Sequence, residues 1–201
     1  MRNTLKLAIL VLSLSTGAAL AQSPMVQPPA PGTRPAPLVL TSSSFQDGGV
    51  IPDKYSGASS SPVSPALSWT GAPANTGAFA IIMHDLDTMP RAAGPDNLHW
   101  LIFNIPAGTT SLPEGVPNTA RLPDGSIQLV NGGNKVGYLP LGARGVYHHY
   151  VIELYALDGT IPVTPEGGRA DATSEILAHT LAHAAYTGRF HLPNSRLRLT
   201  L

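Results

Sequence analysis

The chain has 201 residues, with 12 basic and 12 acidic side chains, 20 glycines, 20 prolines and no cysteine. The balanced charge excludes a non-specific nucleic-acid binder, which needs clustered lysine and arginine. The lack of cysteine excludes disulfides, thiol catalysis and cysteine-bound metals. Glycine and proline are too frequent for a helical bundle and favour many short strands.

The N-terminus has the three parts of a secretory signal peptide. A basic stretch precedes an apolar run, and Ala19-Leu20-Ala21 has the small-x-small pattern of a cleavage site. We therefore expect residues 1–21 to be removed on export and the protein to be periplasmic or secreted. Residues 22–37 contain six prolines and few large apolar side chains, which predicts a disordered linker. One globular domain is expected over residues 38–201.

Three apolar runs in this domain are rich in β-branched and aromatic residues and are bounded by turn residues. They cover Phe79–His84, His99–Ile105 and Tyr147–Leu157. This pattern is typical of strands, and no internal repeat accompanies it.

Helical periodicity is confined to one late segment. Asp171 is the expected N-cap, the apolar stripe comprises Leu177, Leu181 and Ala184, and Gly188 is the expected stop. Strands followed by a single helix predict an all-β fold, an antiparallel two-sheet sandwich with a small C-terminal helix.

Strand alternation assigns several polar residues to faces. In the last strand His148 and Tyr150 share one face, and His149 lies on the other. Asp85 and Asp87 continue one face of the first strand beyond its apolar part.

His99 opens the middle strand, where alternation places it on the same face as Leu101 and Phe103. His84 and His149 are expected to face away from the other polar residues, as structural or surface groups. Polar side chains at the ends of apolar strands predict a pocket at the rim of the sandwich. Four residues are expected to converge there: Asp85, His99, His148 and Tyr150.

Six blocks, in order along the chain, resemble the phosphatidylethanolamine-binding protein family, in particular its bacterial, Raf-kinase-inhibitor-like branch. The blocks are Phe45–Tyr55, Ser64–Trp69, His84–Asp87, Leu98–Pro106, Leu112–Pro117 and Tyr147–Tyr150. The resemblance runs from about Leu38 to His191, and six ordered blocks are far more specific than any one of them.

The resemblance implies a two-sheet sandwich with a small pocket for phosphate-like anions, including phospholipid headgroups. Carried over to this sequence, the ligand-binding residues are Asp85, Asp87, His99, Pro140, His148 and Tyr150. Imidazole and phenol groups can donate hydrogen bonds to an anion, and a carboxylate can orient an imidazole. Leu139 stands where the family has a glycine in the pocket wall.

Function is expected to be that of an exported anion-binding protein, with no catalysis, no cofactor and no metal. One alternative is a protein-interaction role, such as inhibition of a protease or another enzyme, as the resemblance also implies. A less favoured alternative is a metal-dependent hydrolase using Asp85, His99 and His148. His179 and His183 have i, i+4 spacing on the predicted helix, which can bind zinc, but a solvated helix face is the preferred interpretation.

The C-terminal tail, residues 192–201, extends past the resemblance. Arg196–Leu201 alternates polar and apolar residues, which predicts a strand. We expect it to pair with an exposed sheet edge of its own domain or of a second copy, so the protein is expected to be a monomer or a dimer through this tail.

Overall fold

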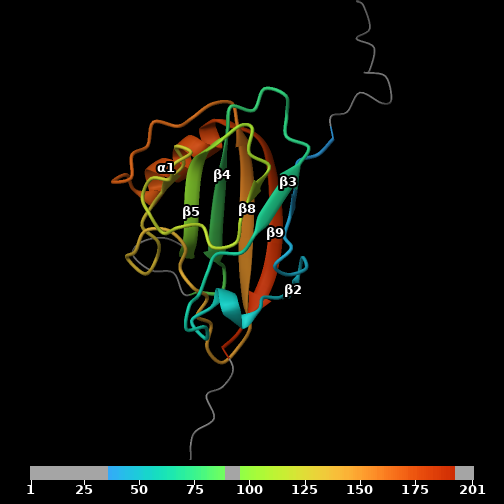
Figure 1. The fold of residues 1–201 in the computed structure, drawn as a ribbon, viewed down its shortest axis with the longest axis vertical. Helices are drawn as coiled ribbons and strands as arrows, with labels where there is room; N and C mark the ends of the chain where they lie inside the picture. The colour runs from blue at the N-terminus through green and yellow to red at the C-terminus, as the bar shows by residue number, and fades with distance from the viewer. Residues whose placement is uncertain (1–35, 89–95, 193–201) are drawn as a thin grey trace, which may run out of the picture. The chain divides into compact units, whose positions relative to one another are not determined.

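The computed structural model describes residues 36–88 and 96–192, and these form a β-rich fold of two sheets (Figure 1). The larger sheet has the spatial order β2 (Gly49–Val50), β9 (Thr180–Phe190), β8 (His148–Leu157), β4 (Ala78–Asp85), β5 (Asn97–Pro106) and β7 (Ile127–Gln128). The smaller sheet has the order β1 (Val39–Thr41), β3 (Leu67–Thr70) and β6 (Ser111–Leu112). In the described part of the chain the helices are the short 3₁₀ helix η1 (Asp53–Tyr55) and α1 (Arg169–Ala178).

The strand pairs are antiparallel except at one edge of the larger sheet. There β2 runs parallel to β9, with Gly49 opposite Gly188, so this sheet is mixed. Gly48 has a positive φ of 70°, and its amide donates to the carbonyl of Thr187 over 2.9 Å. A positive φ is readily adopted by glycine, and it turns the chain alongside β9. The prediction of a wholly antiparallel sandwich is wrong at this edge.

Alternation along β4 separates two apolar layers. Phe79, Ile81 and Met83 belong to the core that also holds Trp69 of the smaller sheet. Ala80 and Ile82 face the other way, into a second core shared with Ala172 and Ile176 of α1. The larger sheet is therefore covered on both faces, which explains why its central strands β4 and β5 are apolar over most of their length.

The late helix is shorter than its apolar stripe predicted. It begins after Gly168, not at Asp171, and ends at Ala178, with His179 as its C-cap. The chain then continues as β9, which pairs with β8 from Thr180 to Phe190.

The physical reason for this difference is burial. Leu177 and Leu181, two members of the predicted stripe, are exposed, whereas Tyr186, Gly188 and Phe190 are buried in the strand. Pairing with a central strand provides both hydrogen bonds and core contacts, which local periodicity does not register. His179 and His183 consequently lie on different elements, and the predicted histidine pair of one helix does not exist.

Residues 1–21, nearly all of the predicted linker over 22–37, and the tail from 193 onwards lie outside the described residues. The predicted signal peptide, disordered linker and C-terminal edge strand therefore stay predictions. A helix that combines the length and hydropathy needed to cross a bilayer is absent from residues 36–88 and 96–192.

Candidate functional site

A β-bulge decides where His99 points. Met83 of β4 is paired with Trp100, but the next residue, His84, is paired with Leu98, so His99 is an extra residue in β5. A bulge re-aims the side chain at that position. His99 packs edge-on against the Tyr150 ring, with ring centroids 5.1 Å apart and an interplanar angle of 87°.

The predicted face of His99 is therefore wrong. Leu101 and Phe103 lie in the core beneath α1, whereas Tyr150 lies in the core between the sheets. Strict alternation assumes an uninterrupted strand. One inserted residue in β5 therefore reverses the face of the sheet that alternation assigns to the residues on the N-terminal side of the bulge. The bulge brings His99 to the same side as Asp85, which is what convergence on one site requires.

A cavity of about 310 Å³ lies at this end of the larger sheet. Its lining residues are Asp85, Thr88, Asn97, His99, Leu139, Pro140, Gly142, Ala143 and His148. Four of the six predicted site residues are thus together on its wall: Asp85, His99, Pro140 and His148.

Asp85 and His148 form a buried hydrogen-bonded pair across β4 and β8. The imidazole Nδ1 lies 2.7 Å from Asp85 Oδ2, and the carboxylate is almost fully buried. Since an ionised carboxylate only accepts hydrogen bonds, Nδ1 carries a proton, and Nε2 has no hydrogen-bond partner among the described residues. The pair fixes the tautomer and leaves Nε2 for a ligand.

His99 has both ring nitrogens occupied. Nδ1 donates to the Leu139 carbonyl over 2.8 Å, so Nε2 accepts from the Asn97 amide over 3.1 Å. Burial lowers the pKa of His99, which favours the neutral ring. His99 lines the cavity, but in this arrangement it holds the wall at Leu139 and has no free proton for an anion.

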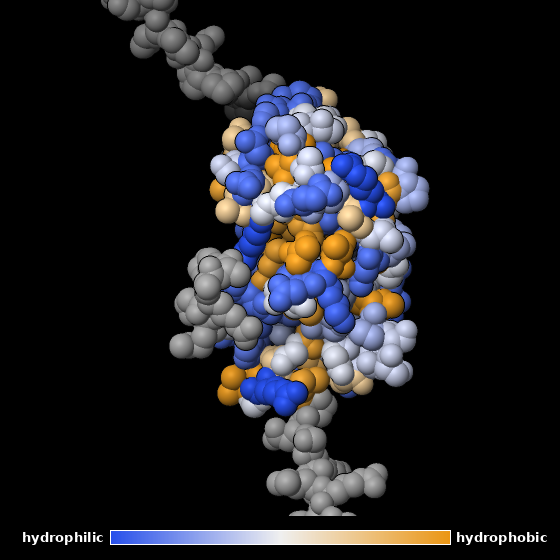
Figure 2. Space-filling view, turned by 90° about the vertical axis from the view of Figure 1, so that its left-hand side faces the viewer, coloured by the Kyte–Doolittle hydropathy of each residue, from blue (hydrophilic) through white to orange (hydrophobic). Residues whose placement is uncertain are grey.

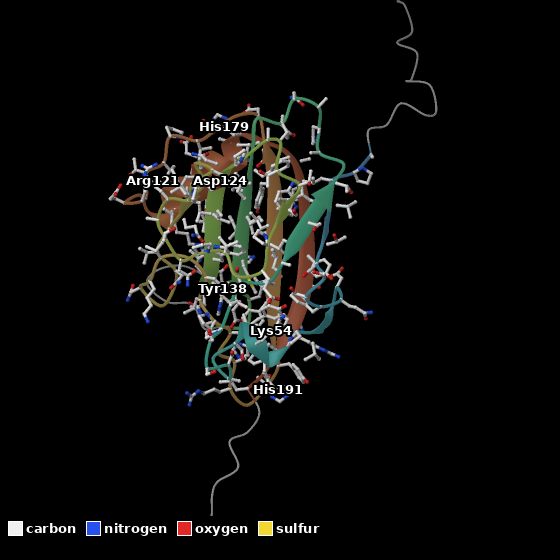
Figure 3. All side chains as sticks on the ribbon, in the orientation of Figure 1. Lys54, Arg121, Asp124, Tyr138, His179 and His191 are labelled. Carbon is white, nitrogen blue, oxygen red and sulfur yellow. The ribbon has the colours of Figure 1, made fainter. Side chains whose placement is uncertain are left out.

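The wall itself is anchored from the core side. Tyr138, labelled in Figure 3, is buried, and its hydroxyl donates to the Tyr55 carbonyl over 2.7 Å. The Leu141 amide bonds the same carbonyl over 3.2 Å. The segment between these two residues, Leu139-Pro140, is thereby held at both ends, and the leucine side chain is accommodated without closing the cavity.

Asp87 lies outside the cavity wall. It accepts the His149 amide over 2.6 Å and pairs with the His149 imidazole over 2.7 Å, and these contacts lower its pKa. The turn after β4 is thereby tied to the start of β8. His149 is exposed, as expected for a residue facing away from His148.

Tyr150 is not in the cavity wall either. Its ring is fully buried behind His99, and its hydroxyl has no hydrogen-bond partner among the described residues. Burial, followed by the charge of Asp85, raises the pKa of Tyr150, so the phenol keeps its proton. A buried hydroxyl without a partner is unfavourable, so a bound water or ligand oxygen near it would be stabilised.

Sequence reasoning missed Asn97, Thr88 and the wall residues Gly142 and Ala143. Asn97 stands two residues before His99, a spacing that marks neighbours on one strand face, and so offered a signal. The Leu139 carbonyl and the Gly142–Ala143 segment offered none, because backbone groups have no side-chain signature.

The three residues proposed as metal ligands do not form a metal site in this arrangement. Both ring nitrogens of His99 are occupied, so this ring has no lone pair free for a metal, whereas the contact with Asp85 occupies only Nδ1 of His148. Residues 36–88 and 96–192 contain no group of three or more histidine or acidic side chains placed to hold a metal.

Behind the cavity, a chain of charges crosses the other face of the larger sheet. His84 lies between Asp96 and Glu153; Asp96 pairs with Arg169 of α1, and Glu153 with His183 of β9. Burial alone would lower the pKa of His84, but hydrogen bonds to Glu153 and Asp96 outweigh it and raise the pKa. The protonated ring therefore stabilises the fold.

Replacing His84 by glutamine is expected to lower the free energy of unfolding by about 1 kcal/mol below pH 6 and by less as the pH rises. A group whose pKa is raised in the folded state adds stability at pH values below its pKa in the unfolded state. This contribution is lost as the pH rises through its pKa in the folded state. Urea denaturation of both proteins between pH 5.5 and 8.5 measures the difference. A gap that widens with pH would contradict the assignment; His149→Gln, at an exposed position, is the control.

Known proteins match this chain over the region that contains the six sequence blocks. The family model described as phosphatidylethanolamine-binding protein matches residues 41–191. A UPF0098 protein of Methanothermobacter thermautotrophicus is 38% identical over 152 residues, which cover 75% of this chain and 97% of the relative. LppC of Mycobacterium tuberculosis, whose name describes it as a candidate lipoprotein, is 30% identical over 165 residues, covering 81% of this chain and 75% of that protein.

A solved structure agrees in fold. The crystal structure of Escherichia coli YbcL, described as a member of the mammalian PEBP family, matches with a TM-score of 0.67 and 27% identity, covering 79% of this chain and all of YbcL. The match of the family model to most of the domain, together with these relatives, shows that this chain belongs to the phosphatidylethanolamine-binding protein family.

Proposed function

We propose that this protein is an exported binding protein whose cavity takes a phosphate-like anion, either free or as a phospholipid headgroup. The observation that carries the proposal is the Asp85–His148 pair on the cavity wall. An imidazole held by a carboxylate at Nδ1 presents Nε2 to a ligand, and in its protonated form it donates a charge-assisted hydrogen bond to an anion.

One further feature supports this ligand chemistry. The Tyr150 hydroxyl, buried behind His99, keeps its proton and has no hydrogen-bond partner among the described residues. An oxygen atom that reached it would gain a hydrogen bond in an environment of low dielectric constant. Asp85, the carboxylate of the wall, is already engaged with His148.

Export is part of the proposal and rests on the N-terminal pattern. The relative LppC is described as a candidate lipoprotein, which supports a location outside the cytoplasm. The proposed location is therefore the periplasm or the extracellular space.

Replacing His148 by alanine is expected to weaken phosphate binding at least tenfold, because a hydrogen bond to a charged group contributes about 1.5–3 kcal/mol. Calorimetric titration with inorganic phosphate and with phosphoethanolamine measures the loss.

His149→Ala is the matched control, because its ring pairs with Asp87 outside the cavity. Equal losses for the two variants would contradict the assignment of His148 to the site. If the unmodified protein bound neither compound at millimolar concentration, the proposed anion site would be contradicted. The protein-interaction role would then be the better account.

A further inference from the structure

The strand β9 has an unpaired backbone edge over part of its length. The Thr187 amide donates to Asp47 Oδ1 over 2.7 Å, and the Thr187 carbonyl accepts from the Gly48 amide over 2.9 Å, so both groups point away from β8. Because this direction alternates along a strand, the N–H and C=O groups of His183 and Ala185 point the same way. Among the described residues, neither has a backbone hydrogen-bond partner on that side. We call His183–Ala185 the free edge.

Neighbouring elements leave the free edge open. β2 pairs with β9 at Gly188 and Arg189, beside the lower part of β9 in Figure 1. β1 of the smaller sheet lies near β9 but pairs with β3. At the opposite edge of the larger sheet, Ile127 of β7 is bridged by Arg121, and Figure 2 looks onto that side, where hydrophobic residues are bordered by hydrophilic ones. In the described part of the chain, the free edge is thus where the larger sheet can pair with a further strand.

The two sides of the free edge differ in polarity. On the inner side, Ala182 and Ala184 are half-buried and pack against the core between the sheets. On the outer side, Ala185 is exposed and lies opposite Glu153 of β8, and the exposed carboxylate of Asp47 lies next to the lower end of the free edge. An added strand with apolar side chains on one face and basic side chains on the other therefore fits both sides.

We propose that the free edge accepts Arg196–Leu201 of a second copy of this chain as an added strand, and that two copies exchange these tails. This segment alternates arginine or threonine with leucine. Its leucines pack beside Ala182 and Ala184, and its arginines lie toward the carboxylates of the outer side. Its peptide groups pair with those of His183 and Ala185, as in other cases of strand addition. The inference does not involve the cavity and is independent of the proposed ligand.

A second copy is favoured because the same chain cannot lay this segment along its own free edge. Leu192 follows β9, and Ala185 lies seven residues before it, about 23 Å back at about 3.3 Å per residue. Residues 193–195, which connect Leu192 to the segment, span only about 10 Å when extended. Asp47, Gly48 and β2 also occupy the direct path along β9. A tail from a second copy approaches the free edge from outside, and a two-fold axis makes the two contacts equivalent.

Sedimentation equilibrium of the full chain tests the proposal. The unmodified protein should form dimers at micromolar concentration, and deleting residues 196–201 should weaken the association at least tenfold. Leu199→Asp should weaken it about tenfold, since it places a charge on the apolar face of the added strand. Ala185→Pro should have a similar effect, because proline has no N–H for the tail and pairing with β8 does not use this group. Val130→Asp, an exposed position near the opposite edge, is the control and should change the association less than twofold.

Engineered cysteines identify the segments that meet, because the chain has no cysteine of its own. Thr200 and Arg198 lie on the polar face of the segment, the face expected beside Ala185. Ala185→Cys protein is mixed with Thr200→Cys protein, or with Arg198→Cys protein, and oxidised with copper–phenanthroline. At least one mixture should give a disulfide-linked dimer that contains both variants.

Several outcomes would overturn tail exchange. They are a monomeric unmodified protein, dimers that persist after deletion of residues 196–201, and the lack of a cross-link in both mixtures. A cross-link confined to one chain that carries both cysteines would mean that the tail returns to its own domain. Efficient linking of Ala185→Cys protein to itself would mean that two β9 strands pair directly. Unfolding midpoints check each variant; if Ala185→Pro is destabilised, Ala185→Lys, which repels the arginines of the tail, tests the same position.

Discussion

Replacing Trp100 by alanine is expected to lower the free energy of unfolding by about 3–5 kcal/mol, the usual loss when a large buried aromatic side chain is removed. Trp100 is fully buried between the two sheets. Its indole N–H donates to Gln128 Oε1 over 2.6 Å, and the Gln128 amide in turn donates to the carbonyls of Pro117 and Thr119. The substitution leaves both a cavity and an unpaired buried acceptor.

Trp100→Phe is the matched control for this experiment. It keeps most of the packing and removes the hydrogen bond to Gln128, so a smaller loss of about 1–3 kcal/mol is expected. Urea denaturation followed by far-UV circular dichroism measures both. Equal losses for the two variants would show that the polar contact outweighs the packing. Two small losses would contradict the burial of Trp100.

Replacing Asp85 by alanine is expected to weaken phosphate binding about tenfold or more at pH 7. Two effects oppose each other: removing a carboxylate from the cavity wall reduces repulsion of the anion, but it also removes the hydrogen-bond partner that orients the His148 ring. The second effect is larger because an imidazole without this partner rotates and exchanges tautomers, so Nε2 is no longer held toward the anion.

Asp87→Ala provides the comparison for Asp85→Ala. Asp87 is an aspartate from the same turn, but its contacts are with His149. Calorimetric titration with phosphate should show a change of less than about twofold for Asp87→Ala. Losses of similar size for the two aspartates would mean that the whole turn, rather than the Asp85–His148 pair, controls the cavity.

Local sequence determined the strands that build the site. The central strands β4, β5 and β8 coincide with the apolar runs, because β-branched and aromatic side chains pack well on a sheet that is covered on both faces. Alternation correctly placed His148 and His149 on different faces of the sheet, since β8 pairs with β9 without a register shift over the residues nearest the site. Family blocks then indicated that Asp85, His99 and Pro140 belong with His148, and the cavity brings these four together.

Tertiary structure alone decided the rest, because the deciding contacts join residues far apart in the chain. The bulge at His99 depends on how β5 registers against β4, and the end of α1 depends on β9 pairing with β8. Asp87 forms its hydrogen bonds with His149, 62 residues away in the chain. His99 donates to the backbone carbonyl of Leu139, 40 residues away. The sequence determined which residues favour strands and which polar groups lie at strand ends. Register and long-range hydrogen bonding, which local preferences do not encode, decided which of those groups face the cavity.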